Sequence, residues 1–134
     1  MAAPTKPTRA ELAILHVLWT HGESTVREIH DRLAPAPRTG YTTTLKQIQI
    51  MMEKGLVSRT ERGRFHVYRA KGQEGTIQKR LIRDLVDLAF GGSSGRLVLQ
   101  ALSAQQASPE ELREIRRLLD QQEQQDAPPR KKSS

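Results

Sequence analysis

The chain of 134 residues contains no cysteine, which excludes both a disulfide framework and a thiolate metal site. Aromatic residues are also scarce, so no aromatic-lined pocket for a small molecule is obvious, although small-molecule sensing stays open as an alternative. No apolar run approaches the ~20 residues of a membrane-spanning helix, and the first residues lack a signal-peptide hydrophobic region. We therefore expect a soluble cytoplasmic protein with no membrane insertion.

Motifs for catalysis or cofactor binding are missing as well. The four histidines, His16, His21, His30 and His66, include no pair at the i, i+4 spacing of a helical metal site. The segment 91–95 (GGSSG) does not match a phosphate-binding loop and is better explained as a hinge. We predict no enzymatic activity, no cofactor and no metal.

Positive charge is present in excess but is unevenly placed. The net charge is +7, and residues 1–72 carry 12 Lys and Arg against 6 Asp and Glu, whereas residues 73–126 carry 7 against 9. A basic first half indicates a polyanionic partner there. The alternative is that the charge only aids solubility.

The first half has the start and stop signals of three helices. Thr8 with Glu11, and Thr25 with Glu28, have the spacing of capping boxes, and Gly22 is expected to end the first helix. A third helix is predicted from Tyr41 or Thr42 to Lys54, with Gly55 as its stop, after a loop at APAPRTG. Two strands, 56–60 and 64–69, are predicted to join across residues 61–63. Three helices followed by a hairpin predict a winged helix-turn-helix, in which the third helix enters the DNA major groove.

The third predicted helix has a core side and a polar side. The residues at core spacing are Tyr41, Thr44 or Leu45, Ile48, and Met51 or Met52. The polar side chains that we expect to contact bases are Thr42, Thr43, Lys46 and Gln47. No carboxylate follows on this helix until Glu53, which suits contact with DNA, and Ile50 falls on the exposed side unless it packs under the wing. An ordinary solvated helix face is the alternative.

The predicted hairpin concentrates arginine. We expect the DNA backbone to be contacted by Arg59, Arg62, Arg64 and Tyr41. Arg62 and Arg64 flank the tip glycine, where side chains can reach a phosphate backbone. The alternative is that the charges only protect an exposed strand edge. Alternation in FHVY does not reveal which face of the second strand is inward.

The second half predicts helices with wide apolar faces. We expect helices over 73–90 and 96–102, and a third that begins with a capping box at Ser108, Pro109 and Glu111. Such short helices could hardly bury these faces alone, so we predict a two-fold dimer, the alternative being packing back onto the winged domain. The expected dimerisation residues are Leu81, Leu85, Leu88, Leu97, Val98, Leu102, Leu112, Ile115 and Leu119. The predicted domains are 8–72 for DNA binding and 73–124 for dimerisation, with flexible tails at 1–7 and 125–134.

Four segments in this order, AELAILHVLW, STVREIHDRLAP, GYTTTLKQIQIMMEKGLV and RGRFHVYRA, resemble the BlaI/MecI family of bacterial transcriptional repressors. The segments FGGSSGRLVLQALS and SPEELREIRRLLDQ resemble the family's dimerisation region. The resemblance implies a homodimeric winged-helix repressor on a palindromic operator, with Thr42, Thr43 and Lys46 reading bases and Tyr68 inward on the wing. Many members carry arginine where this chain has Ile50, so we expect a different operator preference.

In some members of that family a membrane-bound sensor protease, triggered by β-lactam, cuts the repressor in its C-terminal region. The resemblance places this cut near Leu99, Gln100 and Ala101, although the local residues differ from the best-known pattern. Copper-responsive relatives use a cysteine pair, which this chain lacks. A winged-helix module that binds RNA or another protein, without operator specificity, is the alternative function.

Overall fold

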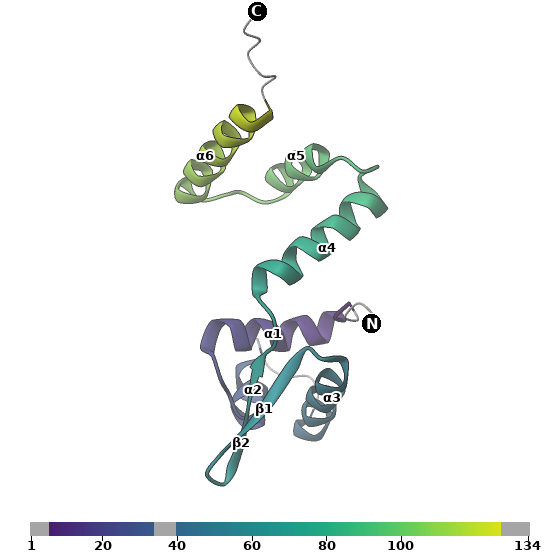
Figure 1. The fold of residues 1–134 in the computed structure, drawn as a ribbon, viewed down its shortest axis with the longest axis vertical. Helices are drawn as coiled ribbons and strands as arrows, with labels where there is room; N and C mark the ends of the chain where they lie inside the picture. Colours follow the sequence, from purple (N-terminus) through teal and green to yellow (C-terminus); the bar gives the residue numbers. More distant parts are fainter. Residues whose placement is uncertain (1–5, 34–39, 127–134) are drawn as a thin grey trace, which may run out of the picture. The chain divides into compact units, whose positions relative to one another are not determined.

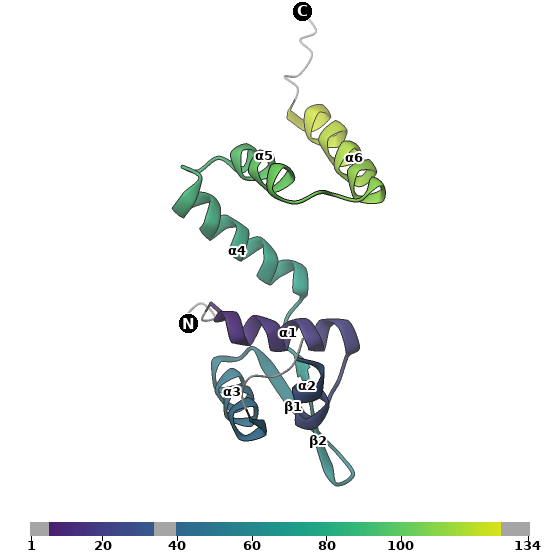
Figure 2. The same cartoon turned by 180° about the vertical axis from the view of Figure 1, so that it is seen from behind.

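A computed structural model describes residues 6–33 and 40–126 of the chain. The described residues form a mainly helical fold with one antiparallel sheet of two strands (Figures 1 and 2). The elements are α1 (Arg9–His21), α2 (Val26–Arg32), α3 (Tyr41–Lys54), β1 (Val57–Arg62), β2 (Phe65–Ala70), α4 (Glu74–Ala89), α5 (Ser94–Ala104) and α6 (Pro109–Asp126). The predicted fold class is confirmed, whereas the loop APAPRTG and most of both predicted tails lie outside the described residues.

Both predicted capping boxes are present at the starts of α1 and α2. The Thr8 hydroxyl accepts a hydrogen bond from the Glu11 N–H at 3.1 Å, and the Glu11 carboxylate accepts one from the Thr8 N–H at 2.9 Å. Thr25 and Glu28 make the same reciprocal pair at the same distances. These bonds satisfy backbone donors that have no partner inside a helix, and they fix where each helix begins.

The bounds of α3 agree with the prediction, and its core side is confirmed with one correction. Thr44, Ile48 and Met51 are fully buried, and Gly55 ends the helix in a left-handed conformation at φ 81°. Tyr41 does not face the core: it is 36% exposed, because it begins the helix at the edge of the domain. Ile50 is 39% exposed and is therefore a surface residue.

The hairpin differs from the prediction at its strand ends. Arg62 pairs with Phe65, so the turn consists of Gly63 and Arg64 alone, and β1 continues two residues further than expected. Gly63 has a φ of 62°, which favours glycine at the first position of a two-residue turn. The arginines therefore belong to the strands and the turn rather than to a longer loop.

Tyr68 identifies the inward face of β2. Its side chain is 3% exposed, whereas Phe65 at the tip is 63% exposed. Ser24, in the loop between α1 and α2, pairs with Tyr68 through two backbone hydrogen bonds of 2.8 and 3.1 Å. This isolated backbone bridge attaches β2 to the loop between α1 and α2. The core around it consists of Ile14, Leu15, Val17, Leu18, Val26, Ile29, Ile48, Met51, Leu56, Val57 and Tyr68.

The C-terminal helices follow the predicted order with small shifts. Ser93 caps α5, which begins at Ser94, so the predicted break at 91–95 is shorter than expected. The Ser108 hydroxyl and the Glu111 carboxylate form the predicted capping box of α6, with bonds of 3.0 and 2.9 Å. Helix α6 continues to Asp126, beyond the predicted end of the dimerisation region.

Contacts divide the chain into two compact units that meet within α4, between Asp84 and Leu85. The sequence instead places the boundary of the DNA-binding domain at residue 72, which stays a prediction. Among the described residues, no helix is long and apolar enough to span a membrane.

Candidate nucleic-acid interface

The exposed side of α3 carries the side chains predicted to contact bases. Thr42, Thr43 and Lys46 are exposed and Gln47 is half-buried. Because Thr44, Ile48 and Met51 point into the core at i, i+4 and i+7, the opposite side of the helix must face solvent. Gln49 and Ile50 continue this exposed side toward the C-terminal end, where Glu53 is its first acidic residue.

A groove of about 660 Å³ separates α2 and α3 from the wing. Three of the predicted backbone contacts, Tyr41, Arg59 and Arg64, line it together. The base-reading candidates Thr42, Thr43 and Lys46 do not line it. The structure thus brings one helix start and two wing arginines to the same hollow, beside the exposed side of α3.

Tyr41 is held by α2, which sequence reasoning did not anticipate. The Arg27 guanidinium lies 4.4 Å from the centre of the Tyr41 ring, a cation–π contact. The His30 ring meets the same tyrosine edge-on at 5.9 Å, and its Nδ1 lies 2.9 Å from the Thr44 hydroxyl. Arg27 and Tyr41 are 14 positions apart on different helices, so no local spacing in the sequence indicated their contact. These contacts fix the N-terminal end of α3.

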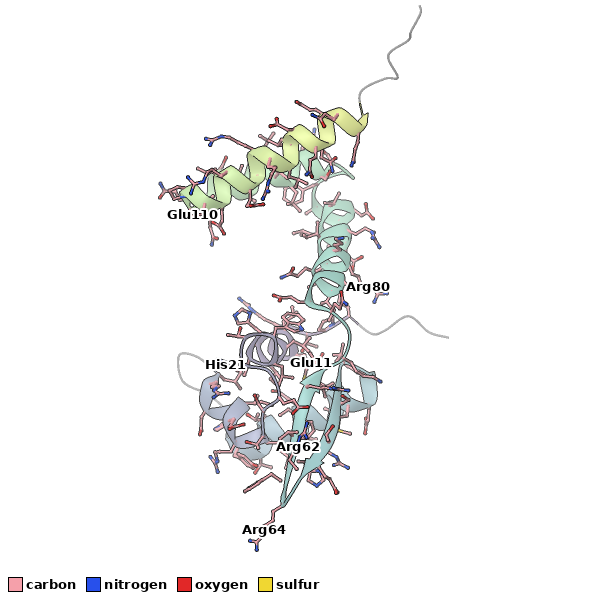
Figure 3. The ribbon with its side chains drawn as sticks, turned by 60° about the vertical axis from the view of Figure 1, so that its left-hand side comes forward. Glu11, His21, Arg62, Arg64, Arg80 and Glu110 are labelled. Carbon is pink, nitrogen blue, oxygen red and sulfur yellow. The ribbon has the colours of Figure 1, made fainter. Side chains whose placement is uncertain are left out.

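Arg62 is engaged within the protein. Its Nη2 lies 3.0 and 3.2 Å from the two carboxylate oxygens of Glu23, in the loop before α2. Arg64 projects from the wing tip (Figure 3), and within the described part of the chain neither Arg59 nor Arg64 has a carboxylate partner. The predicted arginines therefore differ in state: two are available to an anion, and one must first leave Glu23.

An ion pair between Lys54 and buried Glu11 connects the C-terminal end of α3 to α1. Lys54, the last residue of α3, donates to both Glu11 carboxylate oxygens at 2.9 Å, and Glu11 is 5% exposed. Burial alone would raise the Glu11 pKa, but the hydrogen bond and charge of Lys54, together with the Thr8 N–H, lower it overall. The carboxylate thus stays ionised and ties α1 to the C-terminal end of α3.

The residues predicted for dimerisation lie on α4, α5 and α6, and many are exposed in the single chain. Leu88 is 84% exposed, Leu119 52% and Leu85 45%, while Leu81, Leu97, Leu112 and Ile115 are half-buried. Val98 and Leu102 are about as exposed as Leu85. The predicted cleavage region, Leu99 to Ala101, lies within α5, where Leu99 is 68% exposed.

No group of three or more metal-ligating side chains is found in residues 6–33 and 40–126.

Comparison with known proteins supports the motif assignment. The penicillinase repressor family model matches residues 7–121. The penicillinase repressor of Bacillus licheniformis is 23% identical over 112 residues, which cover 84% of this chain and 88% of that protein.

One solved structure supports the fold. A MarR family protein from Bacillus stearothermophilus has a TM-score of 0.53 and 21% identity over 90% of this chain and 76% of its own. The PcaV transcriptional regulator from Streptomyces coelicolor is less similar, with a TM-score of 0.48 and 20% identity over 86% of this chain and 76% of its own. The chain therefore belongs to the penicillinase repressor family, the BlaI/MecI family indicated by its motifs, and is a winged-helix transcriptional repressor.

Proposed function

We propose that this protein represses transcription as a homodimer that binds a palindromic operator, with α3 in the major groove and the wing against the backbone. The observation that carries the proposal is the exposed side of α3. It presents Thr42, Thr43 and Lys46 toward solvent and no acidic residue before Glu53. Hydroxyl and ammonium groups can hydrogen-bond to base edges, whereas a carboxylate here would be repelled by phosphate.

The groove beside α3 supports a division of roles. Arg59 and Arg64 line it without a carboxylate partner among the described residues, so they can neutralise phosphates. Such contacts position the protein on the duplex and carry little sequence information, which leaves specificity to α3. Two copies of α3 in a two-fold dimer would read half-sites about 34 Å apart, or a multiple of this spacing.

The apolar faces of α4, α5 and α6 support dimerisation. Leu88 and Leu119 are exposed in the single chain, and a partner that covers them would remove apolar surface from water. Isologous contact between two copies is the commonest arrangement that buries such faces.

We also propose that repression is relieved when a membrane-bound sensor protease cuts within α5. Leu99 is exposed, but the segment is helical, so the helix must open locally before a protease can bind it in extended form. Fragment mapping after incubation with the cognate sensor tests this, and an uncut chain after induction would count against it.

The test of operator reading compares variants of α3 with a variant of the wing. Thr43→Ala and Lys46→Ala should each weaken operator binding by about 1–3 kcal/mol and reduce the preference for operator over scrambled duplex. Arg62→Ala should weaken binding to all duplexes alike and reduce the salt dependence. Fluorescence anisotropy with labelled duplexes at several salt concentrations measures both. Equal losses on random DNA for all three variants would leave only nonspecific binding, as in a module without operator specificity.

A further inference from the structure

A second hollow of about 660 Å³ lies in the first unit, between the open end of the hairpin and the first turns of α4. Its apolar lining comes from Pro7, Leu56, Ile77 and Leu81. Leu56 and Ile77 belong to the hydrophobic core or pack against it, so this part of the lining is fixed by the fold. The volume falls within the range of small-molecule sites, about 300–1,000 Å³.

Basic side chains provide the charged part of the lining. They are Lys71, Lys79, Arg80 and Arg83, and no acidic residue is among the described residues that line the hollow. In the described part of the chain, no carboxylate forms an ion pair with Lys71, Lys79 or Arg83. Like charges three and four residues apart on one helix repel each other, so an anion between them would be favourable.

Two carboxylates on α4, those of Asp84 and Glu74, interact with residues that do not line the hollow. Asp84, which follows Arg83, pairs with Lys6 at 3.4 Å. Glu74, at the start of α4, accepts a hydrogen bond from Gln78 at 3.2 Å. Among the described residues, neither carboxylate forms an ion pair with Lys71, Lys79 or Arg83.

The hollow lies at the end of the winged unit opposite to the proposed DNA contacts. Leu56 and Lys71 adjoin the open end of the hairpin, where the Lys71 N–H donates to the Leu56 carbonyl at 2.9 Å. A strand of six residues places the wing tip about 20 Å away. Gly55, also in the lining, follows the C-terminal end of α3, and the 14-residue helix places Tyr41 about 20 Å away. Figure 3 shows Arg64 and Arg80 at opposite ends of this unit.

We propose that this hollow is a binding site for a small amphipathic organic anion, in which Lys71, Lys79 and Arg83 hold a carboxylate or sulfonate. The hydrocarbon or aromatic body of the ligand packs on Leu56, Ile77 and Leu81. A ligand with both parts satisfies the unpaired cations and covers the apolar floor, whereas inorganic phosphate leaves the floor exposed. The bound anion links the end of β2 to α4. Binding at this site does not depend on the proposed operator recognition.

The experiment titrates the full-length protein with 8-anilinonaphthalene-1-sulfonate, an anionic dye that fluoresces in apolar sites. N-phenyl-1-naphthylamine, which lacks the sulfonate, is the neutral probe. The double variant K79Q/R83Q should bind the anionic dye about tenfold more weakly, since it loses two charge-assisted contacts, and bind the neutral probe unchanged. The double variant R113Q/R116Q removes the same charge from α6 and should leave both affinities unchanged.

Amide spectra of protein labelled at glycine locate the site. The amide signals of Gly55 and Gly72, which line the hollow, should shift on adding the sulfonate dye, while that of Gly63 at the wing tip should not. Equal dye affinity in K79Q/R83Q and wild type would overturn the proposal, as would a shift at Gly63 alone. It would also fail if K79Q/R83Q changed only the salt dependence of duplex binding, because these cations would then serve DNA.

Discussion

Glu11 shows how one side chain can serve two elements. Its carboxylate caps α1 through the Thr8 N–H and accepts both hydrogen bonds from Lys54 at the end of α3. The sequence predicted the first contact, because Thr8 and Glu11 are only three residues apart. It gave no sign of the second, which joins residues 43 positions apart. Local polar contacts can be predicted from spacing, whereas contacts between distant elements depend on the packing of the core.

Replacing Glu11 should reveal this pair as a pH-dependent contribution to stability. Its pKa is lowered in the folded state, so the contribution is complete above the ordinary value of 4.5 and is lost as the pH falls through the folded-state pKa. We expect Glu11→Gln to reduce the free energy of unfolding by about 1–3 kcal/mol at pH 7 and by much less in acid. Urea unfolding at several pH values measures this. Glu53→Gln, an exposed change on α3, is the control, and parallel pH profiles for wild type and Glu11→Gln would contradict the assignment.

The Glu23 carboxylate forms an ion pair with Arg62, which we expect to contact the DNA backbone. Arg62 must exchange this carboxylate for a phosphate, so the pair reduces the net gain from DNA binding. Glu23→Gln should raise the affinity for every duplex about two- to fivefold, and should steepen the slope of log K against log salt by up to about 0.9. Binding titrations over a range of salt concentrations test this expectation.

Glu61→Gln is the matched control for that experiment. Glu61 lies beside Arg62 on the wing and changes the net charge equally, but its carboxylate lies 3.9 Å from His66 rather than against Arg62. The double variant E23Q/R62Q should lose the gain. Equal gains for Glu23→Gln and Glu61→Gln would show that only net charge matters.

At the scale of elements, the sequence predicted what spacing determines. The bounds of α3, the starts of α1 and α2 and the end of α1 follow from caps, glycines and apolar periodicity, and they agree with the structure. The strand ends could not be predicted, and alternation left the inward face of β2 open because FHVY is partly apolar on both faces. Only the family resemblance implied that Tyr68 faces inward, and its 3% exposure confirms this. The backbone bridge between Ser24 and Tyr68 fixes the orientation of this strand, and it joins residues 44 positions apart, for which the sequence has no local signal.

Helix α3 provides a direct comparison of its two sides. Ile48 is fully buried and Ile50 is 39% exposed, so the same truncation removes different amounts of packing. Ile48→Ala should reduce the free energy of unfolding by about 2–5 kcal/mol, including the cost of a cavity. Ile50→Ala should change it by less than about 0.5 kcal/mol. Urea unfolding followed by Trp19 fluorescence measures both, and similar losses would mean that the helix is rotated from the described orientation.

At the scale of the whole molecule, helical spacing identified apolar faces, whereas the dimer and the residues expected at its interface stay predictions. The apolar stripes of α4, α5 and α6 follow from helical spacing, and the structure leaves Leu85, Leu88 and Leu119 exposed. Leu81, Leu97, Leu112 and Ile115 on the same helices are half-buried in the single chain. Periodicity identifies an apolar face, whereas the contacts on that face depend on how two copies pack.

Leu88 is the most exposed of these side chains and therefore offers the sharpest test of the proposed dimer. A carboxylate at this position would have to be buried without a partner if Leu88 meets a second copy, which is strongly unfavourable. We expect Leu88→Glu to shift the protein from dimer to monomer in analytical ultracentrifugation. Its preference for a full palindrome over a single half-site should fall at the same time, because only a dimer engages both half-sites.

Phe65→Glu is the matched control, since it also places a carboxylate at an exposed apolar position but lies on the wing, outside the residues proposed for dimerisation. It should remain dimeric and lose affinity for all duplexes through repulsion from phosphate. A Trp19 unfolding transition like that of wild type would show that Leu88→Glu still folds its winged unit. If folded Leu88→Glu sediments as a dimer, Leu88 does not lie in the interface. If wild type is itself monomeric at the concentrations that bind operator, the two-fold arrangement is wrong, because one copy of α3 cannot read both halves of a palindrome.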